Sequence, residues 1–272
     1  MVVNPNFYLA LVLGSILFLG SAKLFKKFHC IRTQHIFVII CILLALISLS
    51  IPSAYLSDLI GANPYYAGFR SFPFAELLVV LAAPLAGAFS AVLAAKKTQS
   101  ISKRLIYRVS LIGTLLYISL PFIKPLMMPL PNHIIGNQWV DGVALQTTPS
   151  TCGPSSMATI LNHYGVKDTE ANIAKQVFSS LTGTENWYLA RYAHSQGFQY
   201  QFLHEPELKK VPTPSIIGVK LGRAGHYITL LDHKNGTYLI ADSLSGLQQM
   251  TLEEFNRKYL YDGFVLHIKL SK

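Results

Sequence analysis

The sequence is poor in cysteine and in charge, and each shortage excludes a class of protein. Its three cysteines form no Cys-x-x-Cys pair and no His/Cys cluster, so neither a disulfide framework nor a zinc site is expected. Only 13% of the residues are charged whereas 51% are hydrophobic, which is too apolar for a simple soluble enzyme. No Gly-x-x-x-x-Gly-Lys-Ser/Thr motif occurs, so we expect no ATP binding, and nothing suggests a metal or other cofactor.

Acidic residues are almost absent from the first part of the chain. Up to residue 130 there are 11 Lys and Arg residues but only two acids, Asp58 and Glu76, whereas the remainder holds 12 basic and 11 acidic residues. The net charge of +10 therefore belongs almost entirely to the first part. This argues against a basic nucleic-acid-binding face on the second part, and we expect no nucleic acid as a partner.

Residues 1–130 are predicted to be a membrane domain. A helix needs about 20 mostly apolar residues to cross about 30 Å of hydrocarbon, and four segments approach this length: 7–25, 35–56, 72–95 and 107–128. The first is not a cleavable signal peptide, because Lys26 and Lys27 follow its apolar run and nothing basic precedes it. Pro121, Lys124 and Pro125 are tolerable near the end of the fourth span.

The basic residues predict the orientation of these spans. Four of them lie at or after the end of the first span and five lie between the third span and the first turn of the fourth, whereas the middle loop has only Arg70. By the positive-inside rule the first and third loops face the cytoplasm, so both termini lie outside. Cys30 should then face the cytoplasm, Cys41 should be buried in lipid, and Cys152 should be the only external thiol. Glu76 is interpreted as an end residue that reaches the interface.

After a linker over 131–143, residues 144–272 predict an α+β domain. Helices are expected after Cys152 and over about 169–181, 186–196 and 252–258, with strands over about 200–204, 215–220, 227–232, 237–242 and 264–270. The helix after Cys152 has apolar residues at i, i+3, i+4 and i+7, a cap in Ser150 or Thr151, and Gly165 at its end.

Cys152 stands where a nucleophilic cysteine belongs, because the positive end of a helix and its unpaired N–H groups stabilise a thiolate. Taken alone, a buried structural cysteine would be the simpler interpretation. Six residues upstream, Gln146 is close enough for its side-chain amide to join the Cys152 N–H in an oxyanion hole.

A predicted hairpin supplies a base and its orienting carboxylate. His226 follows a glycine and begins an apolar strand, Asn235-Gly236 is a hairpin turn signal, and Asp242 ends the next strand. The two side chains share a face only if the hairpin contains a bulge or a loop with an odd number of residues. Asp232 and Asp262 are interpreted as turn formers.

These residues lie in motifs that resemble a known family. The segment from Gln146 to Gly165, with Gln-Thr-Thr-Pro-Ser-Thr-Cys at its start, resembles the signature of the bacteriocin-processing, double-glycine leader peptidases, a branch of the papain-like cysteine peptidases. Gly225-His226-Tyr-Ile-Thr-Leu-Leu looks like their histidine strand, and Leu239-Ile-Ala-Asp242-Ser-Leu-Ser-Gly246 like their aspartate motif, although these enzymes commonly have Asp-Pro there.

The resemblance implies a membrane-anchored papain-like domain, with helices on an antiparallel sheet, that cleaves a peptide or protein. Cys152 would be the nucleophile, His226 the general base and acid, Asp242 the orienting residue, and Gln146 the oxyanion donor. The bacterial cell (inner) membrane is the expected location, with the catalytic domain extracytoplasmic, and a secretion or export system is a partner to consider. Two alternatives stay open: a transpeptidase or amidase that uses the same acyl-thioenzyme, and a non-catalytic peptide-binding module of a secretion system.

Overall fold

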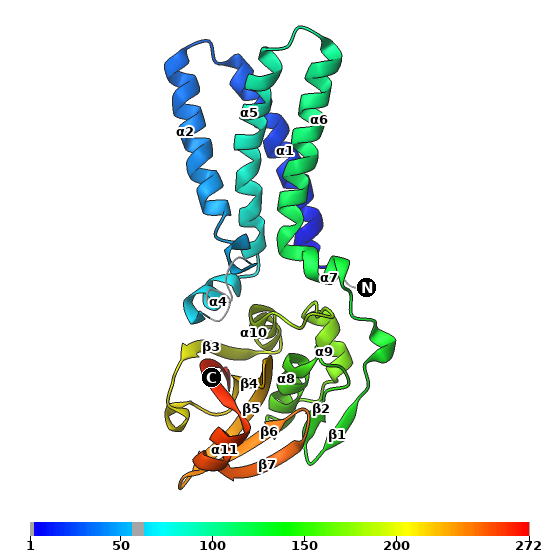
Figure 1. Ribbon diagram of the computed structural model, residues 1–272, viewed down its shortest axis with the longest axis vertical. Helices are drawn as coiled ribbons and strands as arrows, with labels where there is room; N and C mark the ends of the chain where they lie inside the picture. Colours follow the sequence, from blue (N-terminus) through cyan, green and yellow to red (C-terminus); the bar gives the residue numbers. More distant parts are fainter. Residues whose placement is uncertain (1–2, 56–62, 272) are drawn as a thin grey trace. The chain divides into compact units, whose positions relative to one another are not determined.

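The computed structural model describes residues 3–55 and 63–271, and its chain divides into two compact units (Figure 1). One unit contains the apolar helices. The other contains the C-terminal domain together with the segment around the short helix α4 (Pro64–Arg70). The predicted architecture, apolar helices followed by an α+β domain with an antiparallel sheet, is confirmed. We describe each unit by itself.

The described part of the chain contains four helices that are long and apolar enough to cross a membrane. They are α1 (Pro5–Lys27), α2 (Ile31–Ser48), η2 (Ala75–Ala82) continuing into α5 (Ala83–Ala95), and α6 (Ser100–Ser119) continuing through η3 (Leu120–Phe122) into α7 (Ile123–Met127). Each overlaps one predicted span. The predicted end of the second span, residue 56, lies outside the described residues. The third span is not one regular α-helix, because η2 is a 3-10 helix.

Small residues let the apolar helices pack closely. A Cβ atom added at Gly87 of α5 would lie 2.2 Å from the Phe18 carbonyl oxygen of α1, so only glycine fits at this approach. Glu76 is fully buried and accepts a hydrogen bond from Asn6 Nδ2 at 3.1 Å. The interpretation of Glu76 as a residue that reaches the interface is therefore wrong, since its side chain is not exposed. The hydrogen bond from Asn6 makes its burial tolerable.

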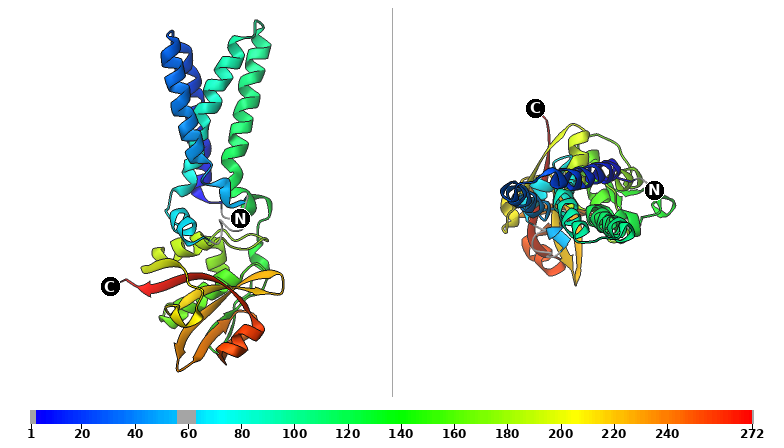
Figure 2. Two further views of the ribbon diagram at one scale, coloured as in Figure 1. Left: turned by 60° about the vertical axis from the view of Figure 1, so that its left-hand side comes forward. Right: turned by 90° about the horizontal axis from the view of Figure 1, so that it is seen from above.

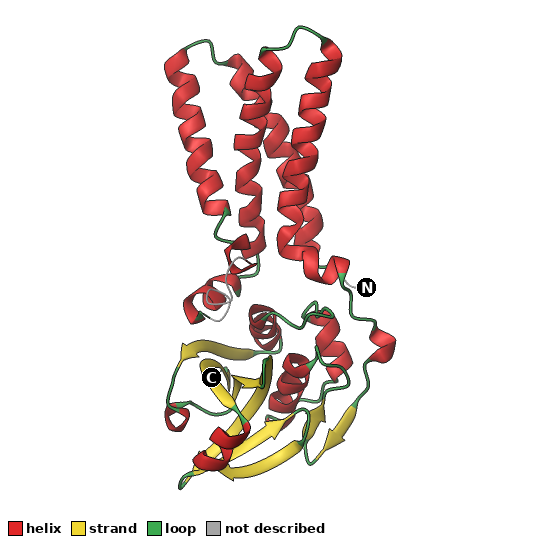
Figure 3. Cartoon of the chain, in the orientation of Figure 1, coloured by secondary structure: helices red, strands yellow, loops and turns green. Residues whose placement is uncertain are grey.

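The C-terminal domain has a six-stranded antiparallel sheet with the strand order β3-β8-β4-β5-β6-β7 (Figures 1 and 3). The strands are β3 (Phe198–His204), β4 (Ser215–Leu221), β5 (Ala224–Lys234), β6 (Thr237–Asp242), β7 (Gly246–Thr251) and β8 (Leu260–Leu270). The helices are α8 (Cys152–His163), α9 (Glu170–Gln176), α10 (Asn186–Ser195) and α11 (Leu252–Lys258). The strands twist across the sheet (Figure 2).

Alternation along the strands produces two hydrophobic cores. Ile216 and Leu266 join the core formed with α8 and α10, whereas their neighbours Ile217 and Val265 join the core that contains Phe255 of α11. Successive side chains of a strand point to opposite faces, so each of these strands is covered on both sides. The sheet therefore has helical cover on both faces, which fixes the strands that carry the candidate site.

The structure differs from the sequence prediction in three segments. The predicted linker holds a small hairpin of β1 (Gln138–Val140) and β2 (Val143–Leu145), which turns at Asp141-Gly142. Strand β7 was not predicted. Helix α9 ends at Gln176 and not near residue 181, because Phe178 has a positive φ of 52° and the chain then turns through Gly183.

The predicted hairpin is formed by β5 and β6, and it contains the bulge that the candidate pair requires. Asn235 and Gly236 form a two-residue turn, and the register shifts between Leu230 and Asp232. Beyond the bulge Thr229 pairs with Ala241, which places His226 and Asp242 on the same face.

Candidate active site

Cys152 is the first residue of α8 and is partly exposed. Thr151 occupies the N-cap position but does not cap the helix, because its hydroxyl accepts from the Thr148 N–H at 3.2 Å and not from an N–H of the first turn; Ser150 Oγ donates to the Leu181 carbonyl at 2.5 Å. The expected side-chain cap is therefore absent. Backbone N–H groups of the first turn have no acceptor within the helix, so those beside Cys152 can stabilise negative charge.

Helix α8 is joined to the histidine strand through Ser156. Ser156 Oγ donates to the Tyr227 carbonyl at 3.2 Å, and Thr229 Oγ1 donates to the Ser156 carbonyl at 3.3 Å. Both partners lie on β5 within three residues of His226. These bonds, with the apolar contacts of α8, set the position of Cys152 relative to the imidazole.

His226 and Asp242 form a buried pair, with 7% and 1% of their surfaces exposed. The His226 Nε2 and Asp242 Oδ1 atoms lie 2.9 Å apart. The Cys152 side chain lies within interaction range of the imidazole and raises the pKa of His226. Because Nε2 is engaged by Asp242, Nδ1 is the nitrogen available to the sulfur. The structure thus brings together three of the four predicted site residues.

The charge of the site follows from these contacts. Burial lowers the pKa of His226, but its hydrogen bond to Asp242 and its interaction with Cys152 outweigh burial and raise the pKa to about 9. Burial raises the pKa of Asp242, but the bonds from His226, Tyr259 and the Leu244 N–H bring it well below its usual range. At neutral pH the pair is therefore imidazolium and carboxylate.

Asp242 receives three further hydrogen bonds, two of them from side chains that were not identified from the sequence. Tyr259 Oη donates to Oδ2 at 2.7 Å, Ser245 Oγ donates to Oδ2 at 3.0 Å, and the Leu244 N–H donates to Oδ1 at 2.9 Å. The last two form a turn of the kind that aspartate makes with residues two and three positions later. The Asp-x-x-Ser pattern could have predicted the bond from Ser245 to Asp242. No local pattern could have predicted the bond from Tyr259, which lies 17 residues away.

Gln146 lies beside the aspartate motif. Its backbone N–H donates to the Ser243 carbonyl at 2.9 Å, and Ser243 Oγ donates to Gln146 Oε1 at 2.7 Å. Since Oε1 accepts from Ser243, Nε2 is fixed as the donor end of the amide. One Nε2 hydrogen goes to the Thr148 carbonyl at 2.8 Å. The second Nε2 hydrogen takes no part in that bond and remains for a substrate oxygen. Ser243 therefore orients the predicted oxyanion donor, and it stands where the resembled family commonly has proline.

Glu170, at the start of α9, organises the loop between Gln146 and Cys152. It is 1% exposed and accepts from the Thr147 N–H at 2.9 Å and from the Thr147 hydroxyl at 3.2 Å. Burial raises the pKa of Glu170, partly offset by these bonds. Glu170 was not identified from the sequence, because its partners lie about one helix away and no motif links them.

The comparisons with known proteins concern the C-terminal domain. The model of the Peptidase C39 family matches residues 142–272. An uncharacterized protein of Methanothermobacter thermautotrophicus is 28% identical over 127 residues, which are 47% of this chain and 87% of that protein. A second uncharacterized protein, from Methanothermobacter marburgensis, is 25% identical over the same shares of both chains.

Two solved structures are also similar. The peptidase domain of Streptococcus ComA, a bifunctional ABC transporter involved in quorum sensing, is 20% identical with a TM-score of 0.42 and covers 47% of this chain and 96% of its own. A double-glycine-motif protease from an AMS/PCAT transporter, in complex with the leader peptide, has the same identity and TM-score and covers 50% and 94%. The resemblance indicated by the sequence motifs is confirmed for this domain by the family match.

Proposed function

We propose, from the premise that the C-terminal domain is a Peptidase C39 domain, that the protein is a membrane-anchored cysteine peptidase. One observation carries this proposal: Cys152 at the N-terminus of α8 lies within interaction range of His226, whose Nε2 is held by the buried Asp242. Nucleophile, base and orienting group stand in the order that an acyl-transfer site requires. The four apolar helices supply the anchor.

Cleavage then follows from the positions of these groups. The Cys152 sulfur attacks the carbonyl carbon of the scissile peptide bond, and the oxyanion is stabilised by the Cys152 N–H and Gln146 Nε2. As the carbon–nitrogen bond breaks, His226 gives its proton to the leaving amine, which departs and leaves a thioester. Water next loses a proton to His226 and attacks the thioester carbon, so the acid product leaves and the sulfur regains its starting state.

The second half of this cycle distinguishes hydrolysis from transpeptidation. An amine in place of water would attack the same thioester and form a new peptide bond. The two products differ in mass, so mass spectrometry of the product identifies the acceptor. We favour water, because it needs no second binding site beside Cys152.

Contacts inside the C-terminal unit support the extracytoplasmic side that the basic loops predict. Helix α4 lies between the second and third apolar helices in the sequence, and its Tyr66 packs on the domain core that contains Trp187. A loop and a domain in contact lie on one side of a membrane, so the chain must cross an even number of times between them. Crossings by the third and fourth helices satisfy this condition, and the positive-inside rule then places both α4 and the domain outside.

A membrane-impermeant maleimide tests this side. Applied to intact cells, after permeabilisation of any outer membrane, it should label the partly exposed Cys152, and the label should vanish in Cys152→Ala. Cys30 should react only after lysis, because the basic loop that contains it is expected inside. A requirement of lysis for the Cys152 label would place the domain in the cytoplasm.

The oxyanion donor gives a second prediction. Gln146→Ala should reduce kcat/KM on the order of 100-fold with little loss of stability, the usual effect of a lost oxyanion donor. Ser243→Ala should cause a smaller loss, because it removes only the bond that orients the amide. Gln199→Ala, at an exposed position of β3, is the matched control. Equal rates for Gln146→Ala and Gln199→Ala would remove Gln146 from the site.

The substrate can be sought without a candidate sequence for it. Mass spectrometry of the peptides released by cells that express the wild type or Cys152→Ala should reveal at least one peptide whose processed terminus depends on the thiol. Identical peptide profiles would contradict the proposed function.

A further inference from the structure

A short helix from the membrane half of the sequence is built into the C-terminal unit. Arg70, the last residue of α4, is fully buried, and its guanidinium carbon lies 4.2 Å from the centroid of the Trp187 ring of α10. Arg70 also donates to the Tyr66 hydroxyl at 2.9 Å, and the Tyr66 ring meets Trp187 edge to face at 6.1 Å. Burial of an arginine is costly unless its charge is compensated. The Trp187 ring and the Tyr66 hydroxyl both interact with the guanidinium and so favour this buried position.

A second arginine holds the C-terminal end of α4. Arg191 of α10 donates to the backbone carbonyls of Arg70, Ser71 and Phe72, with 3.2 Å from Nε to the Ser71 oxygen and 2.7 Å from Nη2 to the Phe72 oxygen. The last carbonyls of a helix have no partner within it and carry partial negative charge, which a guanidinium matches. Tyr200 Oη of β3 adds a bond to Ser71 Oγ at 2.9 Å.

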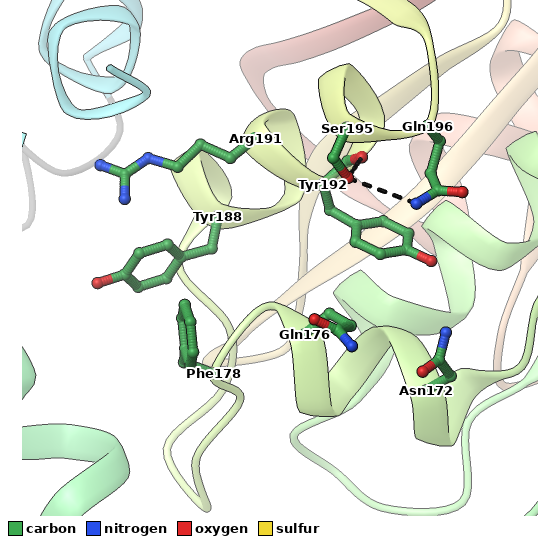
Figure 4. Close-up of a pocket in the computed structure, with 8 residues that line it drawn as sticks. All are labelled: Asn172, Gln176, Phe178, Tyr188, Arg191, Tyr192, Ser195 and Gln196. Carbon is green, nitrogen blue, oxygen red and sulfur yellow. Dashed lines mark hydrogen bonds between the residues drawn. The ribbon is translucent and has the colours of Figure 1, made fainter. Parts of the chain in front are cut away.

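Arg191 stands at the edge of a cavity of about 370 Å³ that is lined by residues of α9 and α10 (Figure 4). The side chain extends past Tyr188, over whose ring it lies at 5.1 Å, and away from Asn172 and Gln176. Arg191 is therefore directed to α4 and not into the cavity.

Helix α10, which α4 holds, forms part of the wall beside the candidate nucleophile. A Cβ atom added at Gly153 would lie 3.0 Å from Leu189 of α10, so α10 packs directly against the turn that carries Cys152. The same added Cβ atom would lie 3.6 Å from the ring of Tyr227, which follows His226, so α10 and the histidine strand meet at this turn. Burial and the charges of Cys152 and Glu185 raise the pKa of Tyr227.

The last turn of the fourth apolar helix and the residues after it reach the same wall. Lys124 Nζ lies 2.7 Å from Oε1 of Glu185, the N-cap residue of α10, and the Leu181 N–H donates to the Met128 carbonyl at 2.9 Å. Leu181 in turn accepts the bond from Ser150, two residues before Cys152. Both chain segments next to the third and fourth spans therefore contact the wall of the site.

We propose that α4 is a positioning element of the peptidase site and that Arg70 and Arg191 are positioning residues that act through α10. This inference rests on the proposed function. The catalytic unit is thus not confined to the residues after the fourth span. It includes a loop helix from between the second and third spans, which stacks on Trp187 and fixes the wall against which Cys152 and Tyr227 lie.

The test uses the full chain in lipid nanodiscs and a peptide that wild-type cells process. Arg70→Ala and Arg191→Ala should each lower kcat about 10-fold to 100-fold, because small displacements of reacting groups cost rate steeply. Arg191→Lys should recover part of the loss, since an ammonium can hold only some of the three carbonyls. Arg257→Ala, an exposed arginine of α11, is the matched control and should stay within about twofold of wild type.

Hydrogen exchange of α10 supplies a readout that does not depend on activity. Exchange should rise in α10 when Arg70 or Arg191 is replaced, and in the milder variant Tyr200→Phe, which removes one hydrogen bond and should fold normally. Unchanged kcat and unchanged α10 exchange in these variants would overturn the inference. If the wild type cleaves nothing, the proposed function fails, while altered α10 exchange still shows that α4 holds this wall.

Discussion

Replacement of Cys152 by alanine should abolish cleavage, with kcat/KM reduced on the order of 10⁴-fold or more. Among the described residues of the site, the Cys152 sulfur is the one placed beside the His226–Asp242 pair to form the acyl intermediate. The measurement is the cleavage rate of a processed peptide by the purified full chain. Alanine fills no new space at a partly exposed helix start, so thermal unfolding should change little.

Cys30→Ala is the matched control, because Cys30 is also a free cysteine at the beginning of a helix, in the N-cap position of α2. Its activity should equal that of the wild type. Full activity of Cys152→Ala would remove the thiol mechanism, and a loss of activity in both variants would point to a general effect on folding.

Replacement of His226 by alanine should cause a loss of comparable size, because both proton transfers pass through its imidazole. The pH profile gives a sharper result than the rate alone. The pKa of His226 is raised to about 9, so the imidazolium is present below that pH and is lost above it. Wild-type kcat/KM should therefore fall as pH rises through about 9, which is the alkaline limb of a bell-shaped profile.

In His226→Ala the remaining activity should lose the alkaline limb and rise with hydroxide concentration. His163→Ala, at the end of α8, is the matched control and should keep the wild-type bell. A wild-type rate that continues to increase above pH 9 would contradict the role of the His226 imidazolium as proton donor.

Much of the site could be predicted from the sequence, because its residues lie in short local patterns. The apolar periodicity after Cys152 defined α8, which begins at that residue. Asn235-Gly236 defined the hairpin. Because side chains alternate between the two faces of a strand, His226 and Asp242 could share a face only with a bulge or an odd loop, and a bulge lies between Leu230 and Asp232. The roles of Cys152, His226, Asp242 and Gln146 stay predictions, which the variants above test.

The contacts that were not predicted join residues far apart in the chain. Tyr259 reaches Asp242 across β7 and α11, and Glu170 reaches Thr147 across the whole of α8. Strand β7 was missed because Gln248 and Gln249 interrupt its apolar pattern. The association of Arg70 with Trp187 spans more than one hundred residues, and a seven-residue helix carries no signal of what it packs against.

The most direct test of the central claim is covalent labelling of the full chain with a pool of peptidyl vinyl sulfones, followed by mass spectrometry of the labelled peptide. These electrophiles react with a thiolate that sits beside a bound peptide. We predict one adduct, on Cys152, which disappears in Cys152→Ala and forms far more slowly in His226→Ala and Gln146→Ala. Adducts formed equally on Cys30 and Cys152, at rates that neither His226→Ala nor Gln146→Ala changes, would contradict a peptidase site.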